Sequence, residues 1–268
     1  MPLVESERRK LHYQVTGEGE PIVIIKGVLF SIKHWLGFEA RLGRHYQVIS
    51  IDNRGISGSS GPVSWNLSVY DMADDIKSVL GHINIPNAHI LGVSLGGMVA
   101  LAMGLKHPKL CRSLQLINTS IGASFLPRIS PKAAVKLIKS GGFNQATYKV
   151  LGEVLFGNAI SEKKRQTTVK SWQKIQNEDG WHRLTTIKQL IAASKFRPRE
   201  TLKDLVTPTH IIYGTEDQFV PPINSFHLFN QIPNAKLTRM RNAGHEVSVD
   251  NPDQLISEIN SFTKTLDN

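Results

Sequence analysis

Short apolar segments alternate with helical patterns along much of this chain, and no other feature of the sequence constrains the fold as strongly. The apolar segments are four to six residues long, and several are rich in Ile and Val, as strands buried on both faces tend to be. Strands that alternate with helices form a mostly parallel sheet that carries helices on both faces. We therefore predict an α/β fold whose strands cover residues 11–16, 22–26, 46–51, 89–92, 113–118, 210–213 and 236–241.

Helix signals lie between these strands. Ser68 and Asp71 have the spacing of an N-cap residue and its partner in a capping box, which satisfies free amides at the start of a helix. Behind them, apolar residues recur on one helical face between positions 72 and 83. We predict three further helices over residues 94–107, 220–231 and 252–266.

The region between Asn118 and Pro208 has a different composition. Strand signals fade there, and Lys, Leu, Ile, Ala and Gln recur with helical spacing. Structureless connections longer than about 15 residues are uncommon, so a segment of this length is expected to fold. We predict an inserted helical cap over one edge of the sheet, with residues 1–119 and 205–268 as the core and residues 120–204 as the cap.

Composition excludes several classes of protein. With 40% hydrophobic residues, a chain of 268 residues can bury a substantial core. Cys111 is the only cysteine, which excludes an internal disulfide and a zinc site built from cysteines. No apolar run approaches the roughly 18 to 20 residues of a membrane-spanning helix, and the polar N-terminus lacks the apolar stretch of a signal peptide. We therefore expect a cytoplasmic protein with no transmembrane segment.

Positive charge is concentrated in one part of the chain. The net charge is +10, and residues 120–200 contain fifteen Lys or Arg against five acidic residues, so this segment accounts for the whole excess. Such a segment can attract an acidic partner, although lysines on helices most often only solvate an exposed face. It has no recognised nucleic-acid-binding motif and no interleaved aromatic residues, so nucleic acid is not an expected partner.

The strongest local signal is Gly92-Val93-Ser94-Leu95-Gly96, which matches the pattern G-x-S-x-G between a predicted strand and a predicted helix. Such a turn holds the serine exposed at a sharp bend, the glycines leave room for the bend, and the helix N-terminus favours negative charge that develops beside the serine. The pattern alone is weak evidence, since a small residue in a tight turn is the ordinary alternative. Its place between strand and helix makes Ser94 a candidate nucleophile.

Partners for Ser94 lie in the loops after the last two predicted strands. Asp217 follows the strand at 210–213 and His245 follows the strand at 236–241. The chain order serine, aspartate, histidine is that of hydrolases with a nucleophile elbow. Because parallel strands end at a common edge of the sheet, we expect the three side chains to meet there.

Together these features resemble the α/β-hydrolase fold family over essentially the whole chain. Lys26-Gly27, followed by seven residues and Trp35, is similar to the family's His-Gly-x7-Trp oxyanion loop, and residues 52–59 are similar to its Asp-x-Arg-Gly-x-Gly-x-Ser turn. The resemblance implies an oxyanion hole formed by the backbone amides of Val28 and Leu95.

Three further points depend on the same resemblance. The family spaces its acid four residues before a proline, which favours Asp217, four residues before Pro221, over the neighbouring Glu216. Lys26 stands where the family usually has histidine, and it either biases the site toward anionic substrates or points away and pairs with a nearby acid. Ser57 replaces a glycine of the arginine turn.

The resemblance implies a serine hydrolase that cleaves carboxylic esters or thioesters. Ser94 would attack the carbonyl to form an acyl-enzyme, with His245 as general base and acid and Asp217 orienting it. A broad carboxylesterase or lipase, a carbon–carbon bond hydrolase and a cofactor-free perhydrolase remain open, as does a non-catalytic binding protein of this fold. The sequence has no HExxH motif, P-loop or G-x-G-x-x-G helix start, so we expect neither a metal nor a cofactor.

The size and basic charge of the predicted cap resemble one particular group of esterases. These enzymes of biotin synthesis remove a methyl ester from pimeloyl groups that acyl carrier protein carries. An acidic carrier docked on residues 120–200 would be steered electrostatically, and its binding would depend strongly on salt. We therefore weigh a carrier-linked ester against a small-molecule ester as the substrate.

Overall fold

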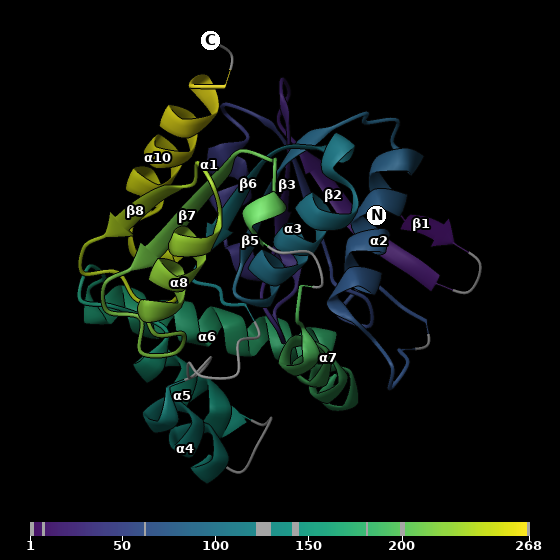
Figure 1. Ribbon diagram of the computed structural model, residues 1–268. Helices are drawn as coiled ribbons and strands as arrows, with labels where there is room; N and C mark the ends of the chain where they lie inside the picture. Colours follow the sequence, from purple (N-terminus) through teal and green to yellow (C-terminus); the bar gives the residue numbers. More distant parts are fainter. Residues whose placement is uncertain are drawn as a thin grey trace.

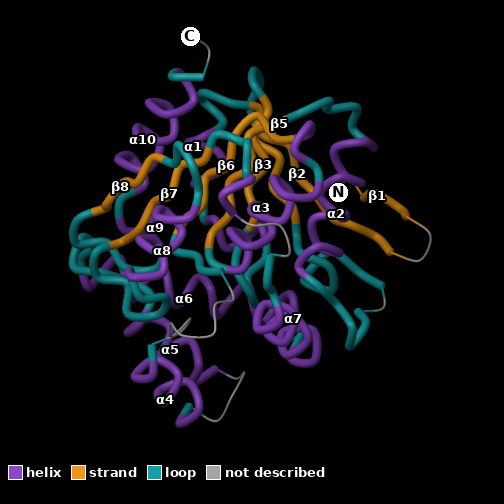
Figure 2. Tube along the Cα trace, in the orientation of Figure 1, coloured by secondary structure: helices purple, strands orange, loops and turns teal. Residues whose placement is uncertain are grey.

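An eight-stranded, mostly parallel sheet runs through the centre of the computed structural model (Figures 1 and 2). The strand order is β1-β2-β4-β3-β5-β6-β7-β8; the pairs β1–β2 and β2–β4 are antiparallel, and all other pairs are parallel. The structure describes residues 3–6, 9–61, 63–121, 130–140, 145–180, 182–198 and 202–266. The strands are β1 (Leu3–Ser6), β2 (Arg9–Thr16), β3 (Pro21–Ile25), β4 (Gln47–Ile51), β5 (Ala88–Val93), β6 (Cys111–Ile117), β7 (Thr209–Gly214) and β8 (Lys236–Met240).

Helices pack on both faces of the sheet because side chains of the central strands alternate between two apolar cores. Val23 and Ile25 of β3 pack with residues of α2, α3 and α8, whereas Ile22 and Ile24 pack with residues of α1 and α10. The core helices are α1 (Phe38–Leu42), α2 (Val69–His82), α3 (Leu95–Lys106), α8 (Ile223–Gln231), α9 (Val247–Asp250) and α10 (Pro252–Lys264).

In the described part of the chain between β6 and β7, four more helices gather beyond one end of the sheet (Figure 1). Three of them, α4, α5 and α6, share an apolar core with loops at the carboxyl ends of the strands, whereas Ala192 of α7 packs with the core of the sheet. Trp172 of α6 is fully buried, and its ring centroid lies 5.2 Å from that of Phe156 and 4.9 Å from that of Phe30 in the loop after β3. These helices are α4 (Pro131–Lys139), α5 (Gln145–Val154), α6 (Glu162–Asp179) and α7 (Arg183–Lys195).

The structure confirms the predicted α/β fold class and all seven predicted strands to within two residues at each end. It also confirms the capping box of α2, because the Ser68 hydroxyl accepts a hydrogen bond from the Asp71 amide and the Asp71 carboxylate accepts one from the Ser68 amide. The sequence did not predict β1, a polar strand at the sheet edge. Helix α8 begins at Ile223 rather than at 220, since Pro221 and Pro222 occupy the turn before it.

The basic segment extends partly beyond the described residues. Arg128 and Arg199, which contribute to the count for residues 120–200, lie outside them. Among the residues that the structure does describe, no helix is both long and apolar enough to cross a membrane.

Candidate active site

Ser94 lies in a strained turn between β5 and α3. Its φ of 57° and ψ of −120° fall where a side chain is disfavoured. A Cβ added at Gly92 or Gly96 would lie closer than 3.0 Å to backbone atoms, so only glycine fits the two flanking positions. The turn is secured by hydrogen bonds from the Ser94 amide to the Ile117 carbonyl (2.9 Å) and from the Thr119 hydroxyl to the Ser94 carbonyl (2.6 Å). The packed backbone thus holds the serine in a conformation that its own preference opposes.

His245 and Asp217 form a buried pair. Oδ2 of Asp217 lies 2.7 Å from Nδ1 of His245, and Oδ1 accepts hydrogen bonds of 2.8 Å from the amides of Phe219 and Val220. The Asp217 side chain is fully buried and that of His245 is 4% exposed. The Phe219 ring contacts the imidazole edge-on, with ring centroids 5.0 Å apart. Both carboxylate oxygens are therefore engaged, and the acid fixes one nitrogen of the ring.

The loops that carry these residues are held together by Asn118, at the end of β6. Its side chain donates to the carbonyls of Gly244 (3.0 Å) and His245 (2.7 Å) and accepts from the amide of Gly214 (2.9 Å). A Cβ at Gly214 would overlap the Gly244 carbonyl, so the two loops approach as closely as glycine permits. The sequence gives no signal for this role of Asn118, because the role depends on how the two loops pair in the fold.

The charges around His245 favour its protonated form. Burial lowers the pKa of His245, but the charge of Asp217, its hydrogen bond and the charge of Glu246 raise it, while Lys26 lowers it; the net pKa lies above the ordinary 6.5. An imidazole of this kind takes up a proton readily. This is the property that a general base requires.

A cavity of about 130 Å³ opens beside Ser94. Its lining is mostly apolar and includes Val28, Leu95, Met98 and Phe219. The backbone amides of Val28 and Leu95 donate no hydrogen bond within the described part of the chain, so both are available to an incoming oxygen.

The Ser94 hydroxyl and Nε2 of His245 form no hydrogen bond with each other or with any other described residue. Hydrogen bonds of catalytic groups are often loose in a free enzyme and tighten when substrate binds. The geometry thus brings Asp217 and His245 together, and it places Ser94, Val28 and Leu95 around one cavity.

Contacts in the structure bear on two questions that the sequence left open, namely the role of Glu216 and the orientation of Lys26. Glu216 accepts hydrogen bonds from the Asn158 amide (2.7 Å) and side chain (3.0 Å), away from the imidazole, so the rival acid is otherwise engaged. Lys26 is buried, and its Nζ lies 2.6 Å from Oε2 of Glu246. It therefore pairs with an acid, and its charge does not stand open to an anionic substrate.

Ser57 adopts a φ of 47°, a conformation that glycine adopts without strain. Its amide donates to Nε2 of His182, at the start of α7, over 3.2 Å. Its hydroxyl is also a hydrogen-bond partner of Asp179, at the end of α6. Contacts with the inserted helices thus compensate for a side chain at this position.

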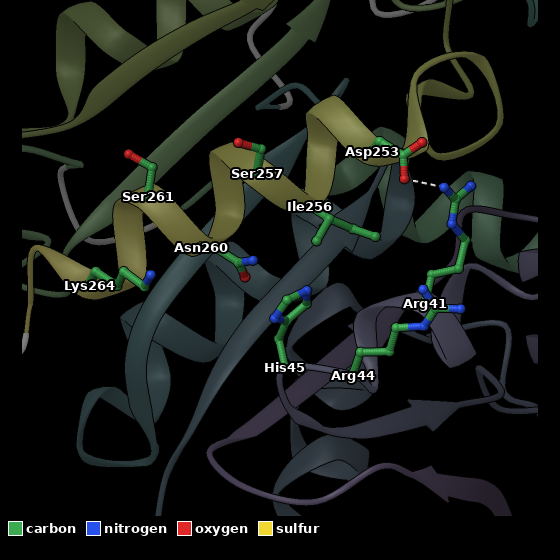
Figure 3. Close-up of a pocket in the computed structure, with 9 residues that line it drawn as sticks. All are labelled: Arg41, Arg44, His45, Asp253, Ile256, Ser257, Asn260, Ser261 and Lys264. Carbon is green, nitrogen blue, oxygen red and sulfur yellow. Dashed lines mark hydrogen bonds and ion pairs between the residues drawn. The ribbon is translucent and has the colours of Figure 1, made fainter.

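A separate groove of about 470 Å³ lies between α10 and the turn before β4, and its lining includes Arg41 and His45 (Figure 3). Arg41 forms an ion pair with Asp253 across it. His45 precedes the amino end of β4, whereas Ser94 follows the carboxyl end of β5, which runs in the same direction. The groove and the cavity therefore lie at opposite ends of the parallel strands. Within the described ranges, no three His, Cys, Asp or Glu side chains cluster as metal ligands would.

Known proteins resemble this chain in sequence and in fold. The sequence model of a family described as the α/β hydrolase fold matches residues 20–139. RutD of Yersinia enterocolitica, a proposed carbamate hydrolase by its name, is 27% identical over 249 residues, which span 91% of this chain and 88% of that protein.

Two solved structures have the same fold. The enol-lactonase of Burkholderia xenovorans LB400 superposes with a TM-score of 0.82 at 19% identity, covering 98% of this chain and 100% of its own. Est816, an enzyme that degrades N-acyl homoserine lactones, gives a TM-score of 0.79 at 24% identity, with 97% and 100% covered. Together with the match of the family model and the eight-stranded sheet, these likenesses show that the chain has the α/β-hydrolase fold.

Proposed function

We propose that this protein is a serine hydrolase that cleaves small, uncharged carboxylic esters through an acyl-enzyme on Ser94. One observation carries the proposal: a buried His245–Asp217 pair, 2.7 Å between Nδ1 and Oδ2, accompanies a strained serine that borders an apolar cavity. A packed backbone keeps a side chain at a disfavoured φ only where the fold over-determines it, and such strain is concentrated at functional sites.

The reaction follows from these roles. Nε2 of His245 takes the proton of the Ser94 hydroxyl as Oγ attacks the carbonyl carbon, and Asp217 stabilises the imidazolium that forms. The tetrahedral intermediate collapses, the C–O bond to the alcohol breaks, and His245 gives the alcohol its proton. Water then attacks the acyl-enzyme with His245 again as base, which releases the acid and frees Ser94.

The amides of Val28 and Leu95 are proposed to bind the oxyanion. Both residues border the cavity and neither amide has a partner within the described residues. Leu95 is the first residue of α3, so its amide lies at the helix end that favours negative charge. Each such donor contributes about 3 kcal/mol to transition-state stabilisation.

The cavity supports a small, uncharged acyl group. Its volume of about 130 Å³ is well below the roughly 300 to 1,000 Å³ of pockets that bind drug-sized ligands. Of its described lining residues none is charged, and Lys26, the nearby cation that could have selected an anion, is neutralised by Glu246. Residues 120–204 are proposed to act as a cap, since Leu190 and Ala193 of α7 contribute to the lining.

Steady-state kinetics with a series of p-nitrophenyl esters would test the proposal. We expect kcat/KM to be highest for acetate or butyrate and to fall for decanoate, and Ser94→Ala to reduce kcat by at least about 10³-fold with the far-UV circular dichroism unchanged. Wild-type turnover in purified Ser94→Ala would refute the serine mechanism. A preference for decanoate would refute the assignment of a small acyl group.

A small carbamate is the second candidate substrate, because RutD carries that activity in its name and matches 91% of this chain. The same serine, base and oxyanion donors would serve, with the carbamoyl carbonyl in place of the ester. Comparing kcat/KM for p-nitrophenyl acetate and p-nitrophenyl N-methylcarbamate separates the two, since only a carbamate hydrolase would turn the second over repeatedly rather than become blocked by it.

A carrier-linked pimeloyl methyl ester is the third candidate, and it depends on the basic charge of the cap. The exposed lysines of α6, among them Lys163 and Lys170, would form the docking surface, together with Lys174, which lies 4.0 Å from Glu178 on the same helix. Other cations of the segment already have partners: Lys188 donates to the Val63 carbonyl (2.5 Å) and Lys164 to the Val249 carbonyl (2.6 Å). A carrier preference that disappears at high salt would support docking; equal rates for carrier-bound and free ester would reject it.

A further inference from the structure

A buried ion pair joins two loops of the candidate active site. Nζ of Lys26 lies 2.6 Å from Oε2 of Glu246, and each side chain is only 2% exposed. Lys26 lies two residues before Val28, whose amide is a proposed oxyanion donor, and Glu246 directly follows His245, the proposed base. The pair therefore connects the donor side of the site with the base side.

The surroundings of this pair are largely apolar. The Lys26 ammonium lies 4.3 Å from the ring centroid of Trp35 and 5.7 Å from that of Phe30, and the Ser248 hydroxyl reaches Oε2 of Glu246 only over 3.4 Å. Burying two charges in such a place is expensive, and a well-packed apolar pair is often at least as stable. Stability alone therefore does not account for a lysine and a glutamate here.

Lys26 and Glu246 are each held in place by contacts of their own backbone or that of the next residue. The Lys26 carbonyl accepts from the Asn53 side chain (3.1 Å), and the following residue, Gly27, packs against Ser94 so closely that a Cβ there would lie 3.1 Å from the serine Cβ. On the other side, the Glu246 amide donates to the Leu155 carbonyl over 2.9 Å. A shift in the separation between Lys26 and Glu246 would thus change the geometry around Ser94.

We propose that Lys26 and Glu246 are positioning residues, whose ion pair sets the separation between the oxyanion-binding loop and the loop that carries His245. This inference rests on the proposed serine hydrolase function and concerns the placement of its parts. Neither side chain lines the cavity beside Ser94; apart from the opposing effects of the two charges on the pKa of His245, each residue acts through the backbone of its loop. A misplacement of catalytic groups by about 1 Å can reduce the rate about 100-fold, so a link of this kind affects kcat.

A double-mutant cycle on p-nitrophenyl butyrate hydrolysis tests this link, using Lys26→Met, Glu246→Gln and the double variant. We expect each single variant to lose about 10- to 100-fold in kcat with KM changed less than about threefold, because the loops are misplaced but the cavity remains. We expect the double variant to lose no more than the worse single variant, since both changes break the same link. Independent, multiplicative losses would overturn the inference, as would unchanged kcat in both single variants.

Two further variants keep the test decisive if a single variant fails to fold. Glu246→Asp retains the charge but shortens the side chain by one methylene, and it should lower kcat while the thermal midpoint stays near that of the wild type. Full kcat in folded Glu246→Asp would contradict a role in setting distance. Lys106→Met, which breaks the exposed ion pair with Asp74, is the matched control and should leave kcat and KM unchanged.

Failure of this inference and failure of the proposed function give different results. If Ser94→Ala keeps wild-type turnover, the proposed function fails. If Ser94→Ala abolishes turnover but the cycle shows independent losses or none, only the positioning role is refuted.

Discussion

Replacing Ser94 by glycine should stabilise the protein while it abolishes hydrolysis. The residue has φ 57° and ψ −120°, where a Cβ is disfavoured and glycine is not. Backbone strain of this kind costs about 1 to 3 kcal/mol. Glycine loses about 0.5 to 1 kcal/mol more conformational entropy than alanine on folding. The difference leaves Ser94→Gly more stable than Ser94→Ala by about 1 kcal/mol.

Urea unfolding and thermal melts of three proteins measure this difference: the wild type, Ser94→Ala and Ser94→Gly. Ser94→Ala controls for loss of the hydroxyl, because it keeps the Cβ and thus the strain. We expect the free energy of unfolding of Ser94→Gly to exceed that of Ser94→Ala by about 1 kcal/mol, which raises the melting midpoint by about 2 to 4 °C in a chain of this size.

Ser78, inside α2, is the matched position without strain. There the same comparison should have the opposite sign, with glycine less stable than alanine by about 1 kcal/mol, as in helices generally. A Ser94→Gly variant that is less stable than Ser94→Ala would show that the turn stores no strain at the serine.

Three further predictions concern pH and loop contact. Because the pKa of His245 is raised and only its neutral form is a base, kcat/KM should fall on acidification with an apparent pKa above 6.5; a limb well below 6 would contradict the assignment. Burial lowers the pKa of His210 to about 3 in the folded protein, from the ordinary value of 6.5 that it has in the unfolded chain. Below pH 6.5 a proton therefore binds to the unfolded state in preference, and the free energy of unfolding falls as the pH falls toward 3. The drop in unfolding free energy from pH 7 to 5 should therefore be about 2 kcal/mol smaller in His210→Gln, and equal drops would refute this. Gly214→Ala should cost about 1 to 3 kcal/mol and lower kcat, since the new methyl overlaps the Gly244 carbonyl; a wild-type melting midpoint and rate would show that the loops have room.

The sequence predicted those parts of the fold that depend on local spacing. Strand β3 was found because its continuous run of Ile and Val is buried on both faces. The capping box of α2 was predicted because Ser68 and Asp71 have the spacing at which each side chain accepts a hydrogen bond from the other residue's amide. Strand β1 was missed because a short edge strand gains its order from pairing with β2, which no local pattern records.

In the candidate active site, spacing indicated Ser94, Asp217 and His245, and the geometry joins the last two directly. Local sequence patterns do not indicate which residues far apart in the chain pair with one another. Lys26 and Glu246 lie 220 positions apart, and the sequence left open whether the lysine pairs with an acid. The size of the cavity was equally inaccessible, since it depends on how α7 packs over the loops.

Covalent labelling can show whether Ser94 is the nucleophile and whether His245 activates it. The protein would be treated with a fluorophosphonate and analysed by intact and peptide mass spectrometry beside Ser94→Ala and His245→Asn. We predict one adduct per chain on the peptide that contains Ser94, none in Ser94→Ala, and labelling at least about 100-fold slower in His245→Asn. An adduct at another residue, or equal labelling of wild type and Ser94→Ala, would contradict the assignment of Ser94 as the nucleophile.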